Sequence, residues 1–356
     1  MKAFKLLIIK KNKMKKSIFY LMLNLSVTFV HSQTPFDDQS WLKNVILSDE
    51  FGASSVDLSK WEYHPPWGTC HSDIAAFKAE NRSQYYGYLT LSAKKENCTC
   101  DQDLARTFST GAIFSKNTVK YGYIEIYCKL PQLDNVTSTG EGLGGSFWLW
   151  PDAPDSYDGD VKWSEIDIFE IDGFQNKHTC NVHYENAIMH NSGEHWSMRD
   201  NTNYDFNIDF STYHKFGCEW TPDYISFYFD DKLIRTTYTE YSDLLLPMNI
   251  RVTIPTPSDQ HGHYIQANTL LPYPFVIDYV RVYKLTMDCN TDISQNNFNY
   301  STFDKKVKRN ITVGGASALI PQGNSVSFRA TQSITLNDGF EVPVGSSFFA
   351  NNCNCE

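Results

Sequence analysis

The chain has 356 residues, of which 41% are hydrophobic, 20% charged and 15% aromatic. This composition excludes a disordered chain and a polytopic membrane protein, because apolar residues are plentiful but form no series of long uninterrupted segments. The formal net charge of −10 argues against nucleic acid and anionic membrane surfaces as main partners. The length favours about two domains.

Residues 1–32 have the pattern of a secretory signal peptide. They carry seven lysines and no acid, and Ile18–Val30 is apolar but short for a membrane span. Cleavage after Ser32 would change the formal net charge from −10 to −17, because those seven positive charges are lost. We therefore expect a secreted, cell-surface or periplasmic protein with no membrane attachment after cleavage. A membrane anchor is the alternative.

All nine cysteines follow the predicted signal peptide. Secretion permits disulfides, and an odd count leaves at least one thiol unpaired. Cys70 with either Cys98 or Cys100 is the expected local bridge. The spacings do not repeat a zinc-site pattern, so we predict no zinc centre.

Short alternating segments separated by turn residues predict an all-β chain. In chain order, the predicted strands include 88–93, 123–130, 224–229, 233–237 and 275–283. The turn at Asp230-Asp231 between two of them predicts a β-hairpin. So many strands over 40–285 predict one domain that is a large two-sheet sandwich.

The composition changes after Lys284. Residues 286–309 are polar and poor in large apolar side chains, so we expect a linker. Residues 310–356 return to short alternating strands and predict a small C-terminal β unit, which is too short to bury much core alone. We find no long internal repeat. Glycan binding, spacing and export are all open as roles of this unit.

Three acids stand in an apolar stretch that otherwise resembles a buried strand. On a regular strand Glu165 and Asp167 share a face, whereas Glu170 points to the other side. One β-bulge between Asp167 and Glu170 would bring all three acids to one face and leave Ile166 on the other. Mutual repulsion would then keep one glutamate charged and the other protonated. A solvated edge strand is the alternative, against which the flanking isoleucine and phenylalanine residues argue.

The segment Glu165-Ile-Asp-Ile-Phe-Glu170 resembles the bulged E-x-D-x-x-E signature of glycoside hydrolase family 16. Asp49-Glu50-Phe51, Phe147-Trp148-Leu149-Trp150-Pro151 and Asp278-Tyr-Val-Arg-Val-Tyr283 extend the resemblance over 40–285. It implies a concanavalin-like β-jelly-roll sandwich with a concave cleft. It also implies a retaining endo-hydrolase of β-linked polysaccharide (EC 3.2.1.-), with Glu165 as nucleophile, Asp167 as its helper and Glu170 as acid/base.

The identity of the polysaccharide is open. The segment Arg251–Pro257 stands where laminarin-cleaving members of the resembled family have a Gly-Gly-rich stretch. We prefer a β-1,3- or mixed-linked glucan, because an acidic protein repels sulfated polymers at long range. An algal galactan (agar, porphyran or carrageenan) is the alternative. A transglycosylase and a non-catalytic, lectin-like carbohydrate-binding protein are also open.

Aromatic side chains near the signature predict stacking surfaces for sugar rings. Trp67 and Trp196, expected in loops, would form outer subsites. By the resemblance, a histidine past the acids lies beside the cleft. The predicted substrate-binding residues are Trp148, Trp150, Trp163 and His183.

The resemblance further implies a structural Ca²⁺ on the convex side. Its ligands would be the side chain of Asp278 and main-chain carbonyls near Glu50 and Gly87. Hard oxygen ligands of this kind suit Ca²⁺. No cofactor is expected for the chemistry itself, and we expect a monomer whose partner is its polysaccharide substrate.

Overall fold

The structure is a computed structural model. It describes residues 41–72, 74–131, 143–151, 163–172, 177–185, 196–197, 209–222, 224–238, 246–255, 271–299, 303 and 306–354. Gln33–Glu356 forms one compact unit. The predicted signal peptide lies outside the described residues. Within them, no helix has the length and apolar character needed to cross a membrane.

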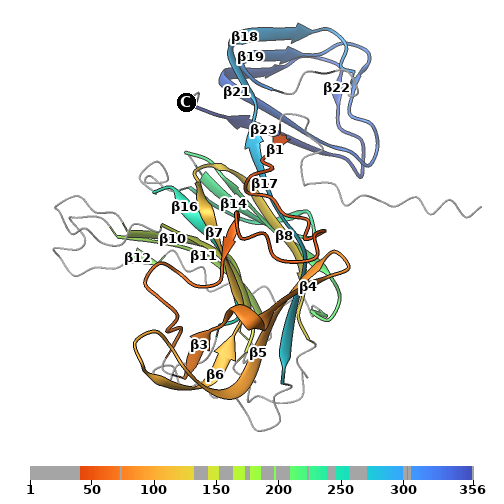
Figure 1. The fold of residues 1–356 in the computed structure, drawn as a ribbon. Helices are drawn as coiled ribbons and strands as arrows, with labels where there is room; N and C mark the ends of the chain where they lie inside the picture. Colours follow the sequence, from red (N-terminus) through yellow and green to blue (C-terminus); the bar gives the residue numbers. More distant parts are fainter. Residues whose placement is uncertain are drawn as a thin grey trace, which may run out of the picture. The chain divides into compact units, whose positions relative to one another are not determined.

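The fold is an all-β sandwich, as predicted, built from a ten-stranded and a seven-stranded sheet (Figure 1). Apart from the parallel pair β3–β6, both sheets are antiparallel. A short 3-10 helix, η1, spans Ala79–Asn81. The ten-stranded sheet contains β15 (Lys232–Tyr238), β14 (Tyr224–Phe229), β13 (His214–Trp220), β8 (Gly122–Lys129), β17 (Tyr273–Leu285), β5 (Tyr88–Thr99), β6 (Ala105–Thr110) and β3 (Ala75–Phe77), with β1 (Trp41–Lys43) on β17 and β4 (Arg82–Tyr85) on β5. The seven-stranded sheet contains, in spatial order, β12 (Trp196–Ser197), β11 (Lys177–Glu185), β10 (Trp163–Asp172), β9 (Gly145–Trp150), β16 (Met248–Thr253), β7 (Ala112–Val119) and β2 (Trp61–Glu62).

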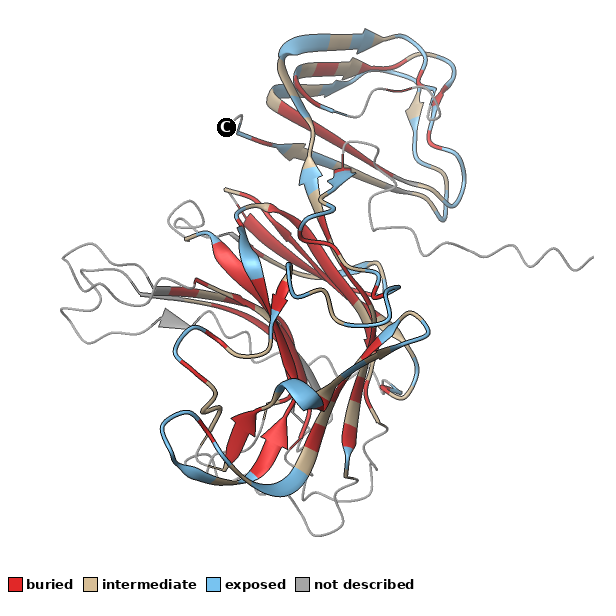
Figure 2. Cartoon of the chain, viewed as in Figure 1, coloured by how far each residue is buried: buried red, intermediate tan, exposed pale blue. Residues whose placement is uncertain are grey.

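One hydrophobic core fills the space between the two sheets. Alternate residues of β8, such as Ile124 and Ile126, belong to the same buried cluster as Leu149 of β9 and Ile166 of β10. The central strands of both sheets are therefore the most deeply buried part of the sandwich (Figure 2). Because the side-chain period of a strand is two, the intervening residues of the seven-stranded sheet face away from this core.

The predicted hairpin at Asp230-Asp231 is confirmed. Asp230 and Asp231 have φ values of 45° and 64° and connect β14 to β15. Two central residues with positive φ are the mark of a type I′ turn, whose twist matches that of the flanking strands.

The C-terminal β unit begins earlier than predicted. β18 (Met287–Gln295) occupies the expected linker and pairs in parallel with β19 (Val307–Val313). The prediction of a linker over 286–309 was therefore wrong. Its polar side chains are those of an edge strand, which needs few apolar residues because one of its sides has no neighbouring strand.

Parallel strands stacked in chain order make this unit a small β-solenoid. β21 (Ser325–Leu336) pairs in parallel with β19 and with β23 (Ser347–Asn352), and the short β20 (Ala318–Leu319) and β22 (Phe340–Glu341) also pair in parallel. Ser325 lies opposite Ser347 and Ala318 opposite Phe340, a spacing of 22 residues in both cases. Each coil therefore stacks on the previous one, a structural repeat that the sequence analysis did not predict.

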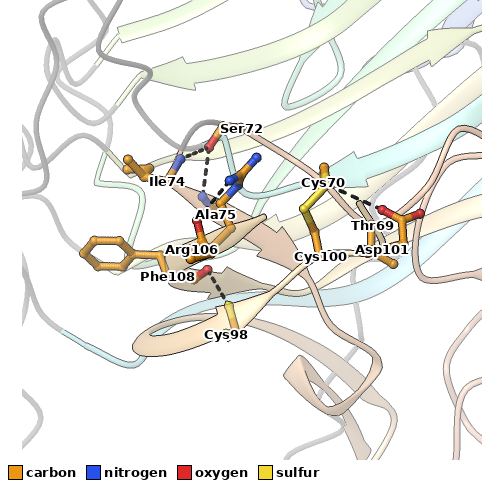
Figure 3. Close-up of a disulfide and its surroundings, with 11 residues drawn as sticks. Thr69, Cys70, Ser72, Ile74, Ala75, Cys98, Cys100, Asp101, Arg106 and Phe108 are labelled. Carbon is orange, nitrogen blue, oxygen red and sulfur yellow. Dashed lines mark hydrogen bonds between the residues drawn. A yellow bond between two sulfur atoms is a disulfide. The ribbon is translucent and has the colours of Figure 1, made fainter. Parts of the chain in front are cut away.

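A disulfide joins Cys70 to Cys100, one of the two pairings predicted (Figure 3). Cys98 remains a thiol, and its Sγ donates to the Phe108 carbonyl at 3.2 Å. The bridge links the segment before β3 to the turn between β5 and β6. It closes a loop of 30 residues at one end of the ten-stranded sheet.

A buried ion pair connects the solenoid to the ten-stranded sheet. Arg329 of β21 donates to Glu219 of β13 at 2.9 Å, and both side chains are 1% exposed or less. The hydroxyl groups of Tyr224 and Tyr228 also donate to this carboxylate, at 2.9 and 3.3 Å. The charge of Glu219 is thus compensated and hydrogen-bonded on several sides.

Candidate active site

The predicted β-bulge is present in β10. The register against β11 shifts between Asp167 and Glu170, and the register against β9 shifts between Asp167 and Phe169. As a result the consecutive residues Ile168 and Phe169 both join the hydrophobic core, together with Ile166. The extra residue restores the acids to the opposite side of the strand, as the sequence predicted.

Neighbouring strands place polar and aromatic side chains beside the acids. Asp167 lies opposite Trp148 of β9 and opposite Asn181 of β11. Trp148 in turn lies opposite Arg251 of β16. A continuous row therefore crosses four strands on the face that points away from the core, which we call the acid face. Glu165 lies on the same face, opposite His183.

The side chains of Glu165, Asp167 and His183 form a tight cluster. Their ligand atoms lie within 4.8 Å of one another. Nε2 of His183 is 3.1 Å from Asp167 Oδ2 and 2.9 Å from Asn181 Nδ2. A neutral Nε2 accepts from the Asn181 amide, whereas a protonated Nε2 donates to Asp167. The role of Asn181 was not predicted, because nothing in its local sequence distinguishes it.

The electrostatics of the cluster favour the protonated form of Glu165. Burial raises the pKa of Glu165 to about 9, and the charges of Asp167 and Glu170 add to this rise, while His183 opposes it. Glu165 and Asp167 also share a hydrogen bond. The sequence predicted that repulsion would keep one glutamate protonated. The raised pKa falls on Glu165, the residue that the resemblance makes the nucleophile.

An arginine missed by the sequence analysis lies under the aromatic residues of the acid face. Arg251 is fully buried, and its guanidinium carbon is 4.7, 4.8 and 5.8 Å from the ring centroids of Trp67, Trp148 and Trp150. These are cation–π distances. A signal was available: Arg251 is the only charged residue of the buried strand Met248–Thr253.

The predicted aromatic residues are placed as follows. Trp148 and Trp150 contact each other edge to face, with ring centroids 6.2 Å apart, and the Trp148 indole donates to Thr253 Oγ1 at 3.1 Å. Trp67 joins them through Arg251. Trp163 begins β10, but its side chain lies outside the described part. Trp196 lies in the strand β12 and not in a loop, because its backbone pairs with Tyr184.

The structure also brings together the surroundings of the predicted Ca²⁺ site. Asp278 lies at a register shift of β17, next to the pair Ile277–Leu89, and Gly87 stands two residues before Leu89. Burial raises the pKa of the Asp278 carboxyl, and the charge of Glu50 adds to the rise while Arg281 opposes it. A bound cation would remove this penalty, so the donor set fits Ca²⁺. The Glu50 side chain itself is taken by Arg281, whose Nε and Nη2 donate to it at 2.9 and 2.8 Å.

Carboxylates gathered on one bulged strand of a β-sandwich, with tryptophans beside them, define a glycoside hydrolase. Comparison with known proteins supports this class. The family model described as "Beta-porphyranase A-D, GH16 domain" matches residues 41–285. The chain therefore belongs to glycoside hydrolase family 16 and is a glycosidase acting on a polysaccharide. The alternative of a non-catalytic, lectin-like protein is therefore wrong.

Individual relatives differ in the substrates that their names state. The chain is 25% identical over 284 residues to glucan endo-1,3-beta-glucosidase A1 of Niallia circulans, covering 70% of this chain but only 39% of that protein. It is 22% identical over 318 residues to the kappa-carrageenase of Pseudoalteromonas carrageenovora, covering 82% of this chain and 77% of that protein. Porphyranase B from Zobellia galactanivorans shares the fold, with a TM-score of 0.56 at 21% identity, covering 69% of this chain and 93% of that one.

Proposed function

We propose that this glycosidase is a retaining endo-hydrolase of a sulfated, agar-type galactan of the porphyran kind. The bulged strand β10 carries the proposal, because it sets Glu165, Asp167 and Glu170 on one face. The porphyranase model that matches the sandwich supports the choice of polymer.

Two displacement steps would cleave the polymer with retention. The Glu165 carboxylate attacks the anomeric carbon while Glu170 protonates the leaving oxygen, so the glycosidic bond breaks and a glycosyl-enzyme forms. Glu170 then takes a proton from water, whose oxygen attacks the same carbon and releases Glu165. Handing the glycosyl unit to a sugar in place of water would give the transglycosylase reaction from the same acids.

In this scheme Asp167 holds a proton while Glu165 attacks. Glu165 must be ionised to attack, yet its pKa is raised to about 9. Since Glu165 and Asp167 are hydrogen-bonded, they titrate as a pair, and the proton can reside on either carboxyl. We assign it to Asp167 during attack, with His183 Nε2 then accepting from Asn181.

Arg251 supports an anionic substrate. Its charge lies directly beneath Trp148 and Trp150, on the face that would meet the sugar chain. A buried cation raises the local potential more than an exposed one, because little water screens it. This local field opposes the long-range repulsion expected from the net charge of −10. A β-1,3- or mixed-linked glucan is the second candidate, favoured by the similarity to the Niallia circulans enzyme.

A panel of laminarin, lichenan, agarose, porphyran and carrageenans tests the assignment. We expect oligosaccharides to be released from porphyran and little or no product from laminarin. NMR of the first product should show the β-anomer. Release from laminarin alone would overturn the galactan proposal, and an α-anomer would overturn retention.

We also propose that Ca²⁺ binds at Asp278 with main-chain carbonyls near Glu50 and Gly87, and that the protein acts outside the cytoplasm. The disulfide between Cys70 and Cys100 supports an oxidising compartment. Calcium would stabilise the fold by mass action, so chelation should lower the melting temperature, and Asp278→Asn should abolish this calcium effect. The same melting temperature with and without chelator would contradict the site.

A further inference from the structure

A second pocket lies away from the acid face, at the ends of three strands of the ten-stranded sheet. It has a cavity volume of about 110 Å³. The turn before β8, the turn after β13 and the end of β17 supply most of its wall. Its lining residues are Lys120, Tyr121, Gly122, Trp220, Thr221, Pro222, Lys284, Leu285, Met287, Cys353 and Asn354.

The charge of this pocket is opposite to that of the protein. Lys120 and Lys284 line it, and no acidic residue is among its described lining residues, although the chain as a whole carries −10. Both lysines are exposed, and Nζ of Lys120 lies 5.1 Å from the ring centroid of Tyr121. A cationic pocket on an acidic protein selects for an anion.

A further feature indicates that the pocket receives a ligand. The indole N–H of Trp220 is fully buried and has no hydrogen-bond partner among the described residues. A buried donor left unpaired costs about 1–3 kcal/mol, so a bound acceptor would stabilise it. Tyr121, whose ring packs edge to face on Trp220 at 5.4 Å, has a φ of 61°. This conformation belongs to the tight turn between β7 and β8, which places the Tyr121 ring against Trp220.

We propose that this pocket binds an anionic sugar unit of a polysaccharide, through a sulfate ester or a carboxylate. The aromatic rings of Tyr121 and Trp220 supply an apolar wall, and the two lysines supply the countercharge. Only the choice of polymer rests on the proposed function.

The enzyme would then bind one polysaccharide chain at two sites. Most pocket residues come from the ten-stranded sheet and its turns, with Met287, Cys353 and Asn354 from the C-terminal unit, whereas Glu165 and Glu170 lie on the seven-stranded sheet. A polymer held at one site raises the effective concentration of its other segments at the second. Long chains would therefore be bound more tightly than short ones.

Affinity electrophoresis of the full chain tests the proposal. The hydrolytically inactive Glu165→Gln protein would be run through gels containing porphyran, alginate or neutral agarose. Adding Lys120→Met and Lys284→Met should raise the apparent Kd for an anionic polymer at least about fivefold, because two charge-assisted contacts are lost. Retardation by porphyran alone would indicate a sulfate ester, and retardation by alginate alone a carboxylate.

A matched pair of exposed lysines provides the control. Lys95→Met with Lys232→Met changes the net charge equally at two residues that do not line the pocket, and should leave the Kd within about twofold. Equal retardation of the pocket and control variants on both anionic polymers would overturn the proposal. In an active background, the pocket variant should keep its kcat/KM on a short oligosaccharide. If the enzyme cleaves no porphyran but the pocket variant is still retarded less by an anionic polymer, only the proposed substrate is wrong and the pocket proposal stands.

Discussion

Two glutamates, one on each sheet of the sandwich, have neighbours of opposite charge. On the ten-stranded sheet, Glu219 meets the guanidinium of Arg329 and two tyrosine hydroxyl groups. On the seven-stranded sheet, Glu165 meets the two further carboxylates of Asp167 and Glu170. Opposite charge makes the first site a structural contact. At the second site, like charges raise the pKa of Glu165 and favour its protonated form, and a shifted pKa of this kind is typical of catalytic groups.

Apolar flanking residues alone do not distinguish these two glutamates. Both glutamates stand among apolar residues in a strand, Glu165 before Ile166 and Glu219 after Cys218. The difference arises from the neighbouring charges: Asp167 and Glu170 stand on the same strand as Glu165, whereas Arg329 reaches Glu219 from β21. Burial alone therefore does not identify a catalytic acid; the sign of the neighbouring charges does.

The largest effect should come from removing the nucleophile. Glu165→Gln cannot form a glycosyl-enzyme, so we expect turnover to fall by about 10⁴-fold or more. Hydrolysis of a good leaving-group substrate would be measured, with circular dichroism as the check on folding. As a matched comparison, Glu170→Gln should also be inactive but should recover with azide. Near-normal turnover in Glu165→Gln would refute the assignment.

The paired carboxylate should respond in stability and not in catalysis. Arg329→Met leaves Glu219 buried without its guanidinium, and we expect a loss of about 3–5 kcal/mol in urea denaturation. The double variant Arg329→Met/Glu219→Gln should recover most of this loss, because it removes the second charge as well. Equal instability of the single and double variants would show that packing, and not charge, explains the effect.

The catalytic carboxylate should show the opposite sign. Its folded-state pKa is raised from 4.5 to about 9, so its favourable protonated form is complete below about pH 4.5 and lost as the pH rises towards 9. Glu165→Gln should therefore be more stable than the parent at pH 9, by on the order of 2–4 kcal/mol, because the coupled acids share the titration. Melting curves at pH 4.5 and 9 would check this. A constant difference between the two variants across this range would contradict it.

The backbone conformation of the site could be predicted because the sequence signals for it are local. Three acids in one apolar strand required a bulge, and the register shift between Asp167 and Glu170 is where it was expected. The turn at Asp230-Asp231 and the bridge from Cys70 also followed from short-range patterns.

What sequence could not supply was mostly long-range pairing. The solenoid repeat rests on few residues, such as Ile311-Thr312 and Ile334-Thr335, which become equivalent only when the strands stack in parallel. Arg251 became part of the site because β16 pairs with β9, over one hundred residues earlier in the chain. The raised pKa of Glu165 depends on burial, which no spacing rule gives.

The smallest expected effect is also the most specific to the acid face. The charge of Asp167 raises the pKa of Glu165, whereas the charge of His183 lowers it. Because Asp167 carries the proton of the pair during attack, Asp167→Asn, which mimics the protonated carboxyl, should leave the acidic limb of the kcat/KM profile in place, whereas His183→Gln should move it to higher pH. Both variants should lower kcat as well, so the position of the limb, and not the rate, is the observable. Shifts of the same sign in the two variants would mean that general damage to the site moves the limb. A shift in His183→Gln alone would show that the neighbouring charges set the pH at which Glu165 ionises, which is the property that separates it from Glu219.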